Sequence, residues 1–244
     1  MKILTVFLIY ILSATATTLG DAGKGKAGDF RYLTGYTGTD WSGASYEFTD
    51  YAPDLSVVLM NNAINSSCST GLWIAYDNVN FNPNLTGGIC SIIAVDDCKK
   101  WAGPCQKMAS SLRYAGSEFG LNDNFYNLYE GNSFHGAEFK GNINAAYLDN
   151  LDLAVSSLII TGQSGWTFYT GVDFTDASVC VYADEMVSNG GVVLNYARVY
   201  SMDELGLPDN SIRSVSRGCA SDRIVGTPPQ AGVERLPAAA SPAN

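Results

Sequence analysis

The residues of this chain that could perform catalysis are few, and their spacing does not favour it. His135 is the only histidine, and no G-x-S-x-G elbow is present to supply a nucleophile that it could activate. Adjacent acids occur at Asp96-Asp97 and Asp184-Glu185, but neighbouring side chains on a strand point apart, which disfavours a glycosidase-like pair. We therefore predict no catalytic residues, no cofactor-binding residues and no enzymatic activity, with His135 as a surface side chain.

The six cysteines are the other reactive side chains, and disulfide formation is the chemistry that they favour. Zinc binding would need C-x2-C pairs or histidine partners, and neither is present. In an oxidising compartment six cysteines form three disulfides, although the sequence alone leaves their connectivity open. Because each pair then closes a loop within one half of the chain, we favour Cys68–Cys90, Cys98–Cys105 and Cys180–Cys219.

The N-terminal residues predict such a compartment. Lys2 precedes an apolar run over 3–12, and small residues follow as far as Ala16, which is the pattern of a signal peptide cleaved after Ala16. The run is too short to span a bilayer as a helix. We predict a secreted, extracellular protein with a signal peptide at 1–16 and a flexible leader at 17–29. The sequons that begin at Asn65 and Asn84 predict that it is a glycoprotein.

The charge balance narrows the class of partner. The formal net charge is −10, and an acidic surface repels both phosphate backbones and anionic lipid head groups. We therefore expect no nucleic-acid partner and no membrane span, since no later apolar run reaches spanning length. An extracellular protein or a glycan remains as the kind of partner that the composition allows, with exposed tyrosines available to stack on sugars.

The elements that position these side chains come from an internal repeat. One string reads Trp-x2-Tyr-x4-Phe, and its two copies are Trp73/Tyr76/Phe81 and Trp166/Tyr169/Phe174. A second string reads Tyr-x4-aromatic-x-Gly and recurs at the same offset, as Tyr36/Trp41/Gly43 and Tyr129/Phe134/Gly136. The chain therefore uses one short unit four times, in two pairs.

The residues around these repeated motifs have the composition of β-strands. Short runs of aromatic and β-branched residues lie at 55–60, 89–95, 153–161 and 191–200, separated by Gly, Asn, Asp and Pro. Long amphipathic helices are absent from the pattern. The polar, Gly- and Asn-rich stretch 117–124 predicts a linker between the two halves.

Each unit contains a local device that would close it. Tyr-x4-Phe-x-Gly predicts a tight hairpin with both rings on one side, in which the glycine adopts a backbone angle forbidden to other residues. A strand near a serine follows each hairpin, at Ser66-Ser67, Ser110-Ser111, Ser156-Ser157 and Ser214. We predict that a serine hydroxyl hydrogen-bonds back to the hairpin and ties the fourth strand to the first turn, which makes each unit a Greek key.

These residues resemble a known family. The stretch from Tyr129 to Gly136, YEGNSFHG, followed by Ser156-Ser157, is similar to the βγ-crystallin Greek-key motif. The four tyrosine-led motifs resemble two such domains of two motifs each. The resemblance implies an all-β chain with two βγ-crystallin-like Greek-key sandwich domains in tandem, at 30–118 and 119–219. The residues beyond, 220–244, have no strand pattern, and we predict a disordered tail.

Two motifs depart from the family pattern at the glycine. Pro83 stands there after Phe81, and its fixed negative φ cannot replace glycine, so we expect that hairpin to be shifted or opened. Asp176 stands there after Phe174 and tolerates the left-handed region better. In the first motif, Thr37 occupies the place where the family has glutamate.

The resemblance also implies where calcium would bind, because many members of this family use Asx-Asx-x-x-Ser/Thr-Ser. Hard cations prefer such carbonyl, carboxylate and hydroxyl oxygens. Asn61 and Asn62 match one site, although Asn65 replaces its Ser/Thr, while Asp152 and Ser156 match another that lacks the second Asx. The remaining two segments, 106–111 and 209–214, carry Lys107 and Arg213, which oppose a cation. We predict at most weak calcium binding, through Asn61, Asn62, Asp152 and Ser156; the alternative is that these are only turn residues.

The leading functional interpretation is a non-enzymatic secreted protein with a structural or binding role. A second is a calcium-binding protein of the same fold. A third is a protease inhibitor or toxin-like effector on this scaffold. An inhibitor would present a rigid disulfide-framed loop, and 98–105 is the only candidate, with Lys99 and Lys100 at its centre.

Overall fold

A computed structural model of the chain describes residues 30–229, and in that range the regular structure is β-strand with single 3-10 turns. The strands are β1 (Tyr32–Tyr36), β2 (Ser45–Phe48), β3 (Ser66–Tyr76), β4 (Ile89–Lys100), β5 (Ser111–Ala115), β6 (Phe125–Tyr129), β7 (Glu138–Gly141), β8 (Ser157–Thr161), β9 (Trp166–Tyr169), β10 (Ser178–Val181), β11 (Glu185–Asn189), β12 (Val192–Val199), β13 (Ser214–Arg217) and β14 (Ile224–Val225). The 3-10 turns are η1 (Leu55–Val58), η2 (Val79–Phe81), η3 (Gly103–Cys105), η4 (Asn132–Phe134), η5 (Asp149–Leu151), η6 (Val172–Phe174) and η7 (Met202–Leu205).

The first domain is built on two long strands, β3 and β4, at the centre of one five-stranded sheet. The first half of β3 pairs with β1, its second half pairs with β5, and β4 pairs with β3 along nearly all of its length. A bridge between Ala52 and Leu112 adds a segment of the first motif to the last strand of the second. Each motif therefore lends its third segment to the sheet of the other, which interlocks the two Greek keys.

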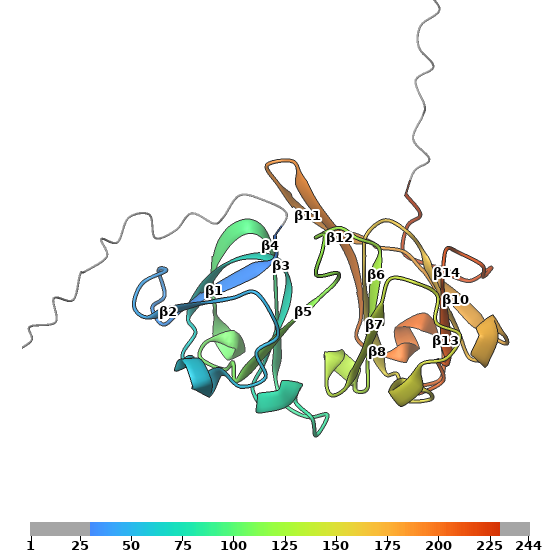
Figure 1. Cartoon of the computed structure of the whole chain (residues 1–244), viewed down its shortest axis with the longest axis horizontal. Helices are drawn as coiled ribbons and strands as arrows, with labels where there is room; N and C mark the ends of the chain where they lie inside the picture. Colours follow the sequence, from blue (N-terminus) through green and yellow to red (C-terminus); the bar gives the residue numbers. More distant parts are fainter. Residues whose placement is uncertain (1–29, 230–244) are drawn as a thin grey trace, which may run out of the picture.

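The second domain repeats this plan with shorter strands. One sheet has the order β11-β12-β8-β6-β7 and the other β13-β9-β10-β14, and a bridge from Ala145 to Val215 corresponds to that of the first domain. The two domains lie side by side, with the β11–β12 hairpin leaning toward β4 (Figure 1). The predicted all-β fold of two tandem Greek-key domains is confirmed.

The predicted serine bonds are present in all four motifs. Ser157 Oγ donates to Gly131 O over 2.6 Å and accepts from the backbone N–H of Phe134 over 2.8 Å. The same pair of bonds, one to a hairpin carbonyl and one from the N–H of the motif's aromatic residue, is made by Ser66, Ser111 and Ser214. We call these four serines the staple serines. Each satisfies two polar backbone groups that the fold buries.

The hairpins explain why the second motif departs from the pattern. In the first and third motifs the backbone N–H groups of Ala44 and Ala137 bond to side chains 7 residues earlier, Thr37 and Glu130. In the second motif the corresponding bond, from Gly88 N to Asp77, spans 11 residues. The hairpin is therefore opened by an insertion, as expected, and Pro83 is not the counterpart of the glycine.

The glycine position itself keeps its left-handed angle in every motif. Gly43 has φ 81°, Gly136 has φ 76°, and Gly87 takes the role in the longer second hairpin with φ 118°. Asp176 has φ 67°, which confirms that aspartate substitutes for glycine in the fourth motif. The motif rings meet edge to face in three motifs, for example Tyr129 and Phe134 at 5.5 Å between centroids.

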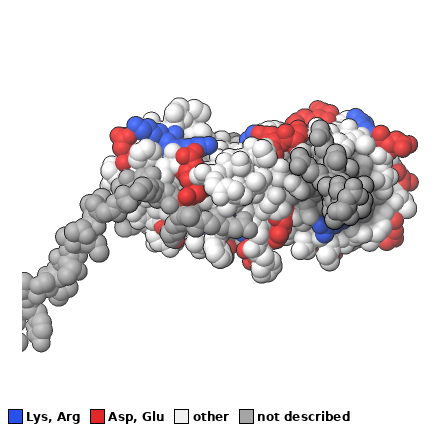
Figure 2. Space-filling view, turned by 90° about the horizontal axis from the view of Figure 1, so that it is seen from above, with Lys and Arg blue, Asp and Glu red and all other residues white. Residues whose placement is uncertain are grey.

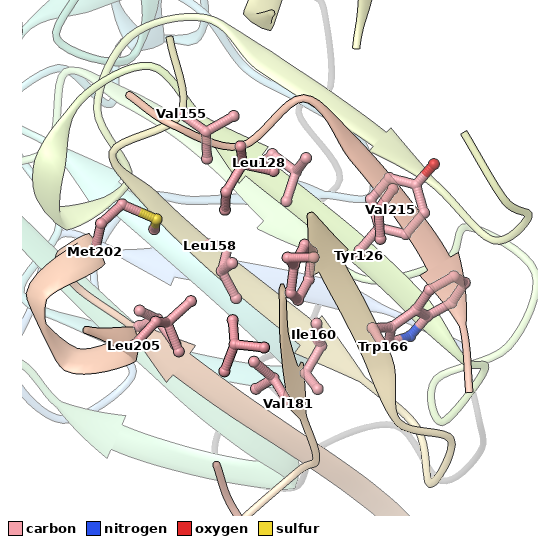
Figure 3. Close-up of a cluster of buried hydrophobic side chains, with 14 of the residues drawn as sticks. Tyr126, Leu128, Val155, Leu158, Ile160, Trp166, Val181, Met202, Leu205 and Val215 are labelled. Carbon is pink, nitrogen blue, oxygen red and sulfur yellow. The ribbon is translucent and has the colours of Figure 1, made fainter. Parts of the chain in front are cut away.

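Three apolar clusters form the core of residues 30–229. One fills the first domain and another the second, where Tyr126 meets Trp166 edge to face at 4.9 Å between centroids (Figure 3). The third cluster crosses the domain boundary: Leu72, Ile74 and Tyr76 of β3 pack with Phe134 and Ile159 of the second domain. The two domains therefore share a core and do not merely touch.

The disulfides are only partly as predicted. Cys180–Cys219 is confirmed, but the first domain has Cys68–Cys98 and Cys90–Cys105 in place of Cys68–Cys90 and Cys98–Cys105. The reason is sheet register: Cys68 and Cys98 lie directly opposite each other on β3 and β4, so they are the neighbouring pair.

The ends of the chain need one correction. The predicted signal peptide at 1–16, the leader at 17–29 and residues 230–244 of the predicted tail lie outside the described residues. Residues 220–229 do have a strand among them, because β14 runs parallel to β10 and pairs with it. The expectation of no strand after Cys219 is therefore wrong.

We predict that Ser157→Ala lowers the free energy of unfolding by about 1–3 kcal/mol, because it leaves a buried carbonyl and a buried N–H without a hydrogen-bond partner. Urea denaturation measures this. Ser188→Ala, at an exposed serine on β11, is the matched control and should change stability by less than about 0.5 kcal/mol. Equal effects of the two substitutions would contradict the staple role.

Candidate functional site

The segments that the sequence singled out for calcium face one another in pairs. In the first domain, Asn62 N donates to Ala109 O over 2.8 Å and Lys107 N to Ile64 O over 2.9 Å. Ser110 Oγ lies 3.4 Å from Asn62 Oδ1. Asn62 from the first motif therefore meets a serine from the second, and we call Asn62, its sequence neighbour Asn61 and Ser110 the Asn62 cluster.

The second domain repeats the arrangement with a carboxylate added. Asn210 N donates to Val155 O over 3.2 Å, and Ser156 Oγ donates to Asn210 Oδ1 over 3.2 Å. Asp209 immediately precedes Asn210, and both are exposed. We call Asp209, Asn210 and Ser156 the Asn210 cluster. Asn62 and Asn210 both have positive φ, 52° and 57°, so the two clusters share a left-handed backbone conformation at the asparagine.

Asp152 has a different partner. Arg213 Nε lies 2.8 Å from Asp152 Oδ1, and its terminal nitrogen lies 2.7 Å from Oδ2, which makes a two-pronged ion pair. The hydrogen bonds from Arg213 hold the pKa of Asp152 below its ordinary value, and the same bonds raise the pKa of Arg213. The guanidinium occupies the place where a cation would otherwise approach this carboxylate.

The structure therefore regroups the sequence-predicted metal ligands. Asn62 contacts Ser110 and Asn61 adjoins it only in sequence, whereas Asp152 and Ser156, predicted to act together, have separate partners. Ser110, Asp209 and Asn210 were missed. Their segments contain Lys107 and Arg213, which oppose a cation. However, Ser110 and Ser156 each contact an asparagine of the facing segment and not one of their own segment. Only the pairing of the segments reveals this.

The donor set of the Asn210 cluster fits a calcium ion better than that of the Asn62 cluster. Calcium takes six to eight oxygen ligands and binds more tightly as carboxylates are added. The Asn210 cluster offers one carboxylate, one amide and one hydroxyl, whereas the Asn62 cluster offers only neutral oxygens. No group of three or more His, Cys, Asp and Glu side chains suited to a metal occurs within 30–229.

Three of the four paired acids have hydrogen-bond or ion-pair partners in the described chain. Glu185 makes a two-pronged ion pair with Arg198, with distances of 2.9 and 2.8 Å. Asp96 and Asp97 differ in surroundings: Asp96 Oδ1 lies 3.4 Å from the hydroxyl of Tyr32, while Asp97 Oδ1 accepts from the backbone N–H of Cys98. These carboxylates serve the local structure of their strands.

His135 is not on the surface, so that prediction is wrong. Its side chain is only 7% exposed and lies between the domains, with Nε2 3.3 Å from Asn82 Nδ2. Burial lowers the pKa of His135, and the nearby Arg113 lowers it further, while the backbone of Leu85 and the charge of Asp77 act in the opposite direction. The hairpin insertion of the second motif brings Asn82 and Leu85 against the third motif, which no local pattern predicts.

A buried arginine fastens the same interface. Arg113, on β5, is 1% exposed and donates across the boundary to Gly136 O over 3.0 Å and to Phe134 O. Its Nε donates to the hydroxyl of Tyr76 over 2.8 Å, and that hydroxyl donates to Phe134 O over 2.7 Å. Arg113, the hydroxyl of Tyr76 and the two carbonyls of the third motif therefore satisfy one another, whereas the buried hydroxyl of Tyr129 in the same cluster has no hydrogen-bond partner among the described residues.

The inhibitor-loop hypothesis loses its structural basis. Cys98 and Cys105 pair with Cys68 and Cys90, so no disulfide frames 98–105. Lys99 and Lys100 lie at the end of β4, hydrogen-bonded within the sheet and not displayed on a loop.

Comparison with solved structures establishes what this arrangement is. The structure of geodin, a βγ-crystallin from Geodia cydonium, superposes with a TM-score of 0.57 at 19% identity, covering 77% of this chain and 99% of that one. This chain has the βγ-crystallin fold. The interlocked keys and the four staple serines are thus the local causes of the βγ-crystallin fold in this sequence.

Other similar structures match less closely. A βγ-crystallin from an archaeon is 24% identical, with a TM-score of 0.30 over 39% of this chain and 99% of its own. Protein S, solved in solution complexed with calcium, is 15% identical, with a TM-score of 0.30 over 76% of this chain and 98% of its own. No protein-family model and no curated protein sequence matches the chain. Over 30–229, no helix is long and apolar enough to cross a membrane.

We predict that acid weakens the domain interface through His135. Because its pKa in the folded state lies below the ordinary value of 6.5, the unfolded chain binds the proton more readily. The stabilisation from neutral His135 is therefore full above about pH 6.5. It is lost as the pH falls from there through the lower pKa of His135 in the folded protein. Thermal melts over this range should show a steeper loss of Tm in the wild type than in His135→Gln. Parallel curves would contradict the prediction.

Proposed function

We propose that this protein is a secreted, non-enzymatic protein with a structural or binding role, acting as one rigid two-domain body. The shared core between the domains is the observation that supports this most directly. Large, apolar interfaces hold domains in one orientation, whereas small polar ones permit movement. Three disulfides and the buried Arg113 add further constraint.

The disulfides also support the proposed compartment. Cysteine pairs of this number persist in oxidising surroundings and are rare in the cytosol. The predicted signal peptide and the two sequons agree with an oxidising, extracellular compartment.

The two sequons differ in their exposure in the structure. Asn65 is 3% exposed, and its amide nitrogen donates to Thr37 O inside the first domain. Asn84 is exposed on the long hairpin of the second motif.

We predict that the secreted protein carries a glycan at Asn84 and none at Asn65, because only Asn84 is exposed in the folded chain. Expression of the full-length sequence in a eukaryotic secretory host, followed by glycopeptide mapping of the medium, tests both compartment and site. Asn84→Gln should remove the mass increment, and Asn65→Gln should leave it in place. A protein retained inside the cell, or a glycan on Asn65, would contradict the proposal.

Weak calcium binding is a second proposed function, and the Asn210 cluster is what supports it. Its carboxylate, amide and hydroxyl come from facing segments held together by the backbone bond from Asn210 N to Val155 O. A single carboxylate gives modest attraction, so we place the dissociation constant in the range of extracellular modules, about 10⁻⁴ to 10⁻³ M.

We predict that calorimetric titration with calcium gives heat in the wild type and little or none in Asp209→Asn or Ser156→Ala. Asp152→Asn is the matched control, because Asp152 is paired with Arg213 and lies outside the Asn210 cluster; its calcium heat should be unchanged. If the wild type shows neither heat nor a thermal shift at millimolar calcium, the calcium function is rejected.

A further inference from the structure

Lys99 and Lys100 line a pocket between the domains. The pocket has a volume of about 470 Å³ and lies between β4 of the first domain and the β11–β12 hairpin of the second. Its apolar wall is formed by Ile92, Ile93, Trp101, Met186, Val187 and Tyr196. A volume of this size is typical of small-molecule sites, which tend to lie at domain interfaces.

The pocket is preformed, because its wall extends the core shared by the domains. Ile93 and Val187, from opposite domains, are partly buried against the interface cluster that contains Tyr196. Trp101 is 6% exposed, and its indole N–H donates to Ser67 Oγ over 2.9 Å, which fixes the ring. Met186 is 64% exposed and forms an open side of the pocket.

A positive charge lies at the edge of this apolar wall. Lys99 Nζ donates to the carbonyl of the pocket residue Ile93 over 2.9 Å, and its nearest carboxylate, that of Asp97, is 4.0 Å away. An ammonium has three donors, so Lys99 retains capacity for a further acceptor. Lys100 also lines the pocket and is paired with Asp40.

The lysines stand out against the rest of the molecule. The chain carries 24 acidic residues and only 14 Lys and Arg. In the view from above, Lys and Arg side chains lie among Asp and Glu side chains over the first domain, while Asp and Glu dominate the second (Figure 2). A cationic edge beside an apolar wall selects a ligand that has a negative head and an apolar body.

We propose that this pocket binds a small amphipathic carboxylate, with its apolar chain against Ile93, Met186 and Val187 and its carboxylate at Lys99 and Lys100. A phosphate-rich ligand fits less well, because no glycine-rich loop or helix N-terminus lines the pocket. A cationic amphiphile would be repelled by the positive charges of the two lysines.

The test uses dodecanoate, below its micelle concentration, titrated calorimetrically into the full secreted protein. Saturable binding of one dodecanoate per chain is the expected result, with much weaker binding of dodecyltrimethylammonium, which has the same apolar chain and the opposite charge. The absence of saturable binding, or equal affinity for the two probes, would overturn the proposal.

Substitutions then locate the site. Lys99→Gln with Lys100→Gln should weaken dodecanoate binding roughly three- to tenfold, because both side chains are half exposed and their ion pairs are partly screened. Met186→Glu, which adds a negative charge to the exposed wall, should weaken it as well. Lys107→Gln, an exposed lysine outside the pocket, is the matched control. Unchanged affinity in the double variant, or an equal loss in the control, would place the binding elsewhere.

Discussion

The fold depends on the satisfaction of two backbone groups by one hydroxyl, repeated four times. A hairpin that folds over its own sheet buries a carbonyl and an N–H that no strand can reach. A staple serine from the last strand of the same motif bonds to both. Without that hydroxyl the closed hairpin would cost more than an open one, and the aromatic residue at its end would not be held over the core.

The domain interface is built from these hairpins. Gly136 N donates to Phe81 O, so the turns of the second and third motifs bond directly to each other. Arg113 reaches the carbonyls of the same third-motif turn, and His135 fills the space beside it. A local device that closes each motif thus also creates the surface on which the domains join. The pocket lined by Lys99 lies at the same domain boundary, but its wall comes from β4 and the β11–β12 hairpin and not from these turns.

Much of this could be predicted from the sequence, because the repeat encodes local geometry. The hairpins, the staple serines and the left-handed angle at Asp176 follow from residue type at fixed spacing. Contacts between distant segments could not be predicted in the same way. The register of β3 against β4 decides that Cys68 pairs with Cys98. Because segments 152–156 and 209–214 face each other, Ser156 donates to Asn210 and Arg213 forms an ion pair with Asp152. The insertion at Asn82 decides that His135 is buried.

The strand β14 protects the second domain from its own edge. Without β14, β10 would present unpaired N–H and C=O groups to solvent, a template for another chain. In the structure Cys180 N donates to Arg223 O over 2.8 Å and Tyr182 N to Val225 O over 2.9 Å. The Cys180–Cys219 disulfide joins β10 to the segment that leads into β14. The residues after the last Greek key therefore form a covalently anchored cover that protects this strand from edge-to-edge aggregation.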